Sequence, residues 1–157
     1  MPANSISTRR IFAAGLAGGT AEVIWVAMYT HATGGSAAHI AQQIAVTFFG
    51  SQPGSVAAGF SIHFALSCAI ALAFSAILLR PLQQVGGRGA VFAGSIAVLI
   101  LIWAFNFFIA LPQINPAFVT LLPLAVTFVS KLLFGLTFGA VLCDAVPQTR
   151  SALAWTH

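Results

Sequence analysis

Apolar positions along the chain gather into four long runs, which are separated by short polar or proline-containing segments. A helix needs about 20 apolar residues to cross the hydrocarbon core of a bilayer, and each run is long enough. The pattern predicts an all-α membrane protein with four transmembrane helices in a bundle, forming one integral membrane domain over residues 1–157. The predicted spans are about 11–31, 55–79, 90–111 and 124–144.

The segment between the first two runs, residues 36–50, carries a narrower apolar stripe. Its members recur every four residues and are Ile40, Ile44 and Phe48. This spacing predicts a short extracytoplasmic amphipathic helix, which lies at the outer membrane interface or forms a re-entrant piece. Pro53 and Gly54 are expected to separate it from the second span. The connection 112–123 has three prolines and is expected to be a loop over the outer end of the bundle.

Composition agrees with a lipid environment, because 59% of the residues are hydrophobic and 5% are charged. A soluble domain has about 25% charged residues. The net charge of +4 comes from too few basic residues to form a nucleic-acid patch, so the expected surroundings are the bilayer and not nucleic acid. Cys68 and Cys143 lie at different predicted depths, which argues against a disulfide framework or a thiolate metal site.

The arginines fix the predicted orientation. They precede the first span, lie between the second and third spans, and follow the fourth span: Arg9, Arg10, Arg80, Arg88 and Arg150. The connections 32–54 and 112–123 contain no Lys or Arg. The positive-inside rule then places both termini in the cytoplasm of a cell with a bacterial-type inner membrane, with Gln52 outside. The start STRRIFAAG also resembles a twin-arginine export signal, but the apolar run continues to Tyr29, which favours a retained span.

Two charges fall inside the predicted spans, Glu22 and the only lysine, Lys131. Each shares a helical stripe with a GxxxG pair, and small residues at that spacing let another helix approach closely. The two pairs are Gly15 with Gly19 and Gly135 with Gly139. At 1.5 Å per residue both charges lie about 16–20 Å from the cytoplasmic end. A charge facing lipid costs at least ~2.5–3.5 kcal/mol, so we expect an ion pair between the first and fourth spans.

Further polar residues extend this layer toward the outer face. Ser67 is level with the pair, and His63, Asn106 and Thr127 lie farther out. The predicted solute or ion pathway therefore consists of Glu22, Lys131, Ser67, His63, Asn106 and Thr127. Gly59 shares the stripe of His63 and Ser67 and is a further packing glycine, and Ser67 or Trp103 is expected beside the pair.

An intramembrane ionisable residue favours a functional role, so the leading prediction is binding or passage of a proton, cation or small solute through the Glu22–Lys131 layer. The first alternative is a non-catalytic structural or assembly subunit of a larger membrane complex, or a homo-oligomer, in which the pair only fixes helix register. The second alternative is haem or metal binding by the outer histidines, although no tight ligand motif occurs and no cofactor is predicted. These histidines are His31, His39 and His63.

An enzymatic role is disfavoured, because the only acidic residues are Glu22 and Asp144 and no nucleophile or phosphate-loop motif occurs. The stretch GGTAEVIW, residues 18–25, is similar to the first span of small multidrug resistance transporters, in which a membrane-embedded Glu follows small residues. This resemblance covers eight residues and implies that Glu22 is a proton or cation site. The extra outer helix, the arginine asymmetry and Lys131 depart from that family's pattern.

Overall fold

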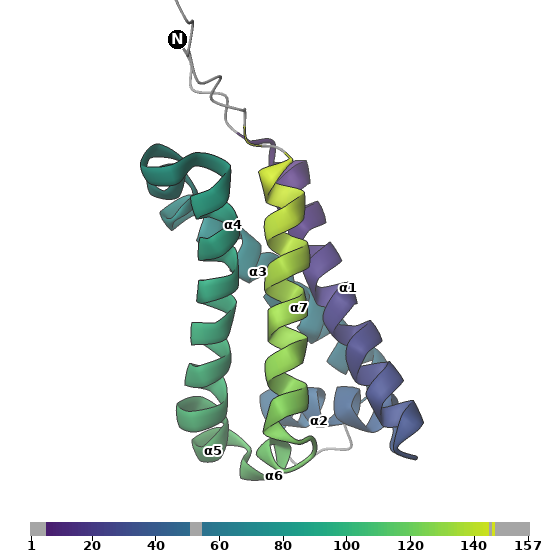
Figure 1. Cartoon of the computed structure of the whole chain (residues 1–157). Coiled ribbons are helices and arrows are strands. Elements are labelled where there is room, and N and C mark those ends of the chain that lie inside the picture. The colour runs from purple at the N-terminus through teal and green to yellow at the C-terminus, as the bar shows by residue number, and fades with distance from the viewer. Residues whose placement is uncertain (1–5, 51–54, 145, 147–157) are drawn as a thin grey trace, which may run out of the picture.

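The computed structural model describes residues 6–50, 55–144 and 146, and within these ranges it is helical, without strands (Figure 1). Its elements are α1 (Thr8–Ala32), α2 (Ala37–Phe49), α3 (Val56–Ile77), α4 (Leu79–Phe105), the π-helix η1 (Asn106–Ala110), α5 (Leu111–Ile114), α6 (Pro116–Val119) and α7 (Leu124–Cys143). Four of these helical stretches are long and apolar enough to cross a membrane: α1, α3, the stretch Leu79–Ile114, which is kinked near its start, and α7. The predicted all-α class and the four candidate spans are therefore confirmed.

The long helices pack in the order α3, α1, α7, α4. Helix α7 has its main contacts with α1 and α4, whereas α3 packs mainly on α1 and α2. Helices α3 and α4 join at Leu78 and diverge toward the opposite end of the bundle, where α2, α5 and α6 lie (Figure 1). The buried core includes Leu99 of α4 and Phe134, Phe138 and Leu142 of α7.

The described arginines gather at one end of the bundle, which we call the arginine end: Arg9, Arg10, Arg80 and Arg88. Two of them bind the chain just beyond α7, since Arg10 Nη1 donates to the carbonyl of Asp144 (3.3 Å) and Arg88 Nε donates to the carbonyl of Val146 (2.7 Å). A cation at a helix C-terminus interacts favourably with the exposed carbonyl groups. Arg150 lies outside the described residues. The opposite end is called the α2 end.

Helix α2 confirms the predicted short helix, which is separate from the following span. The Ser36 hydroxyl caps it by accepting from the amide of His39 (3.3 Å), and it ends at Gly50, whose φ of 79° suits glycine. Pro53 and Gly54, which were expected to cause the break, lie outside the described residues. Ala41 and Ala45 are buried, so α2 packs across the end of the bundle.

The third predicted span agrees with the structure at its start and differs at its end. A short helix from Leu79 is separated from the rest of α4 by the non-helical backbone of Gly86 and Gly87, the latter with φ 57°, so the long helix begins just after these glycines. It does not end at Pro112 but continues to Ile114. The π-helix η1, which comes just before Pro112, is wider than an α-helix. This width accommodates Pro112, which has no amide proton and whose ring crowds the turn before it.

The expected loop over residues 112–123 was wrong in part, because this segment contains the helical turn α6. The side chain of Asn115 accepts a hydrogen bond from the amide of Phe118 (3.2 Å) and so caps α6. Pro116 occupies the first position of this turn, where a missing amide proton costs nothing. Pro116 therefore starts α6, and the preceding helical stretch ends at Ile114, two residues before it.

Candidate functional site

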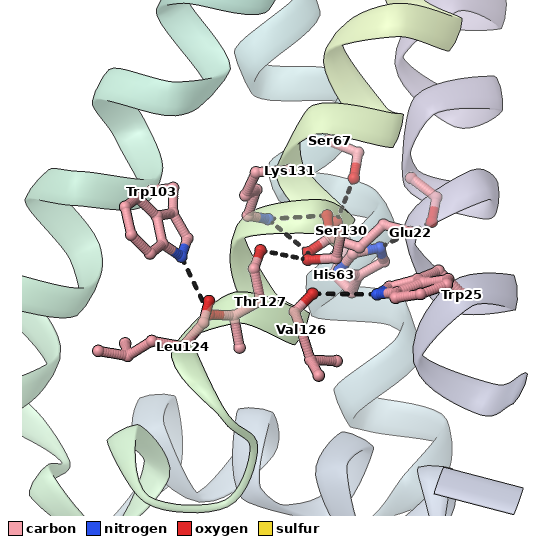
Figure 2. Close-up of polar contacts among 11 residues, drawn as sticks. Glu22, Trp25, His63, Ser67, Trp103, Leu124, Val126, Thr127, Ser130 and Lys131 are labelled. Atoms are coloured by element: carbon pink, nitrogen blue, oxygen red, sulfur yellow. Dashed lines mark hydrogen bonds and ion pairs between the residues drawn. The ribbon is translucent and has the colours of Figure 1, made fainter. Parts of the chain in front are cut away.

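The Glu22 carboxylate of α1 and the Lys131 ammonium of α7 form an ion pair (Figure 2). Nζ of Lys131 lies 2.7 Å from both carboxylate oxygens. The side chains are 12% and 16% exposed respectively, and the Ser130 hydroxyl lies 3.2 Å from Oε1 of Glu22. The predicted ion pair is confirmed, and its two charges neutralise each other within the bundle.

Three glycines of α1 set the distances between the helices that carry the pair. A Cβ on Gly15 would lie 2.8 Å from the Ser67 carbonyl oxygen, and one on Gly19 would lie 2.6 Å from the Ser67 hydroxyl. A Cβ on Gly18 would lie 2.7 Å from the ring of Phe134. Gly15 and Gly19 therefore bring α1 against α3, while Gly18 brings α1 against α7, where the charges meet.

The second GxxxG pair packs against a different helix. A Cβ on Gly135 would lie 2.9 Å from Cα of Ile96, and one on Gly139 would lie 3.0 Å from the ring of Phe92, both in α4. Both GxxxG pairs therefore make close helix contacts, Gly15 and Gly19 with α3 and Gly135 and Gly139 with α4, and they do not face each other. Successive residues in a helix point about 100° apart, so the neighbouring Gly18 makes the α1–α7 contact instead of Gly15 and Gly19.

Two tryptophan side chains hold the start of α7 beside the pair (Figure 2). Nε1 of Trp25 donates to the Val126 carbonyl (3.0 Å), and Nε1 of Trp103 donates to the Thr127 hydroxyl (3.0 Å). Trp103 thus lies close to the pair, as predicted. Because α1 and α4 each donate one indole hydrogen bond to the first turn of α7, they fix the position of the turn that precedes Lys131.

His63 and Ser67 of α3 bind the backbone. Nε2 of His63 lies 3.1 Å from the carbonyl oxygen of Gly19, and since a carbonyl can only accept, Nε2 carries the proton. The Ser67 hydroxyl donates to the carbonyl of His63 (2.8 Å). Ser67 is 2% exposed, and it packs against Gly19. His63 borders the site, whereas Ser67 serves the packing of α3 on α1.

A cavity of about 200 Å³ lies between the ion pair and α2. Its polar lining residues are Glu22, Thr47, His63, Thr127, Ser130 and Lys131. The rest of its lining is apolar and includes the α2 stripe: Ile40, Ile44 and Phe48. The polar floor and apolar walls are the usual construction of a small-molecule site.

The side of the cavity away from the ion pair is formed by α2 and the α5–α6 segment, and we call it the roof. A side-chain hydrogen bond holds it together. Nδ2 of Asn115 donates to the Thr47 hydroxyl (2.9 Å) and so joins the α5–α6 connection to α2. Phe118 of α6 and Leu122 complete the lining on this side. Sequence reasoning missed Thr47, although it lies three residues after Ile44 and therefore on the same helical face.

The predicted pathway is only partly assembled at the cavity. Glu22, Lys131, His63 and Thr127 line it, whereas Ser67 does not and Asn106 is not among the described residues that do. Asn106 begins η1, and Phe107 faces the cavity in its place. Ser130, which sequence reasoning did not select, contacts Glu22 directly.

The outer histidines do not form a metal site in the described part of the chain. No three His, Cys, Asp or Glu side chains gather there with the spacing needed to hold a metal ion. His31 and His39 are exposed, and His63 is bound to Gly19. Comparisons of the chain with protein-family models, with curated proteins and with solved structures find no match.

Proposed function

We propose that this chain is an inner-membrane protein that binds a small solute in the cavity and passes it along the Glu22–Lys131 layer. The observation that carries the proposal is that the cavity extends from the roof formed by α2 down to the ion pair. In the proposed orientation the arginine end and both termini are cytoplasmic, and α2 lies on the outer side. The solute would enter or leave on the α2 side.

A solute fits this site better than a bare metal cation. Cation sites in proteins supply several oxygen ligands, and here both Glu22 oxygens already accept from Lys131 while Oε1 also accepts from Ser130. The other side-chain oxygens of the lining are the hydroxyl groups of Thr47, Thr127 and Ser130, and Glu22 is the only carboxylate among the described lining residues. Movement of a proton along the same layer requires Lys131 to leave Glu22 first.

A purely structural subunit would use the ion pair only to fix α1 against α7. That role needs no cavity beside the pair, and it needs no opening to the surface. Two of the lining residues are also exposed, Phe48 of α2 (56%) and Leu66 of α3 (45%), so the cavity lies at the surface of the bundle and not in its interior. This position favours the solute-binding role.

Flux measurements in proteoliposomes test the proposal. A trapped pH-sensitive dye reports proton movement under an imposed gradient, and light scattering reports entry of small amides and polyols that cross bare lipid slowly. We expect the wild-type protein to accelerate at least one of these fluxes, and Glu22→Gln to abolish the acceleration. Leu72→Trp is the control, because Leu72 is an exposed α3 residue that does not line the cavity. Fluxes equal to those of protein-free liposomes, or unchanged by Glu22→Gln, would contradict the proposal.

A further inference from the structure

Nearly every hydrogen-bond donor on the cavity wall is already used. The hydroxyl groups of Thr47 and Thr127 donate to backbone carbonyls at 2.9 Å, and that of Ser130 lies 2.7 Å from the Thr127 carbonyl as well as 3.2 Å from Glu22. The Nε2 proton of His63 is directed at the Gly19 carbonyl. These hydroxyl and Nε2 protons are therefore directed at oxygens of the protein and not at a ligand.

Lys131 is different, because an ammonium group has three N–H donors. Two of them are satisfied by the carboxylate oxygens of Glu22, and the third has no hydrogen-bond partner among the residues that the structure describes. The ring of Phe134 lies 5.8 Å from Nζ, so it stabilises the charge without accepting a conventional hydrogen bond. A ligand in the cavity therefore meets one uncommitted donor, and that donor is on Lys131.

The charge balance of the site restricts the ligand further. Glu22 and Lys131 already neutralise each other, and the remaining walls are largely apolar. An additional charge brought into such surroundings would be left unpaired, at a high cost. The volume of about 200 Å³ compares with roughly 150 Å³ for an apolar protein cavity that binds benzene, so the ligand is compact.

From these observations we infer that the ligand is a compact, neutral, mostly apolar molecule with one acceptor oxygen, which accepts a hydrogen bond from Lys131. The inference rests on the proposed function and specifies its solute class. Leu66 lies about midway along α3 and is exposed while lining the cavity, so in a spanning bundle this side of the cavity is at the depth of the hydrocarbon. Neutral apolar molecules concentrate in the bilayer, and we place their entry to the cavity at this residue, which we call the Leu66 opening.

Calorimetric titration of the protein in nanodiscs tests the ligand class, with empty nanodiscs as the blank for lipid partitioning. The probes are acetophenone, which has one carbonyl oxygen, and cumene, a hydrocarbon of the same shape without it. A hydrogen bond to a charged donor predicts that wild-type protein binds acetophenone about tenfold more tightly than cumene. Benzoate, which brings a net charge, is expected to bind less tightly than acetophenone. Equal binding of acetophenone and cumene, or tighter binding of benzoate, overturns the inference.

Substitutions at the ion pair and at Leu66 test whether the probes bind in this cavity. In Glu22→Met with Lys131→Met, the acetophenone preference is expected to disappear while cumene still binds, which shows that the cavity is intact. Leu66→Trp is expected to weaken both probes by obstructing the opening, whereas Leu72→Trp on the same helix leaves them unchanged. A preference that survives the double change, or a Leu66→Trp variant that binds as wild type does, overturns the inference.

The binding and flux measurements fail independently. If neither probe binds but the proteoliposomes show Glu22-dependent flux, the ligand class is wrong and the proposed function stands. If acetophenone is preferred but no flux depends on Glu22, the ligand class stands and the proposed passage is wrong.

Discussion

Gly59 of α3 lies against the carbonyl oxygen of Ala41 of α2, with no room for a side chain between them. This contact lets α2 lie flat across the end of the bundle, where its buried residues Ala41 and Ala45 face inward. The roof of the cavity therefore depends on a backbone-to-backbone approach at a single glycine, in addition to the hydrogen bond between Asn115 and Thr47.

Replacing Gly59 with Ala is expected to displace α2, because the added methyl group would collide with the backbone at Ala41. Overpacking of this kind costs about 1–3 kcal/mol. Amide hydrogen exchange in residues 37–49 should become faster. Gly89→Ala is the matched control, since a Cβ at that helical position meets no atom within 4 Å. Unchanged exchange in the Gly59 variant would show that α2 is not held by this contact.

Removing the charge of Arg88 is expected to loosen the C-terminal end of α7. The Nε of Arg88 donates to the Val146 carbonyl at 2.7 Å, and Arg88→Met leaves that group without this donor. We expect a loss of about 1 kcal/mol in the free energy of unfolding, and faster amide exchange near Asp144. The comparison is Arg80→Met, which removes an exposed arginine at the same end. Equal effects of the two changes would argue against a specific role for Arg88.

The proposed orientation is tested by labelling single cysteines in a Cys68→Ala, Cys143→Ala background. His39→Cys places an exposed thiol on α2, and Gln84→Cys places one at the arginine end. In intact cells, a membrane-impermeant thiol reagent should modify the cysteine at residue 39 and spare the one at residue 84. Labelling of residue 84 alone would reverse the orientation and place the cavity roof in the cytoplasm.

The spans and the ion pair could be predicted from the sequence because lipid imposes severe constraints. Apolar length identifies the spans, and a lone buried Glu22 at the same depth as the only lysine has one available partner. The depths of the two charges follow from the helical rise, which is nearly invariant. The partner helix of each GxxxG pair does not follow from the spacing alone, because it depends on how the helices pack.

The cavity could not be predicted, because it depends on how short elements dock. The apolar stripe of α2 is equally compatible with a membrane interface and with a covered cavity, and its position over the cavity depends on the contact at Gly59 and on the hydrogen bond between Asn115 and Thr47. Asn106 was selected for its polarity and its depth, but the neighbouring Phe107, which lies four residues after Trp103 on the same helical face, lines the cavity instead.

The central claim is that Glu22 and Lys131 serve the passage of a solute as well as the packing of α1 on α7. Either charge left alone would be buried without its partner, so Glu22→Gln or Lys131→Met is expected to lower the free energy of unfolding by roughly 3–5 kcal/mol. The double variant, Glu22→Gln with Lys131→Met, carries neither of the two buried charges. It should recover much of this stability.

The most direct measurement is therefore solute and proton flux in proteoliposomes that contain the double variant, after unfolding measurements have shown that it is folded. We predict a stable protein whose flux equals that of protein-free liposomes. A double variant that is stable and passes solutes at the wild-type rate would show that the pair is only structural, and would contradict the claim.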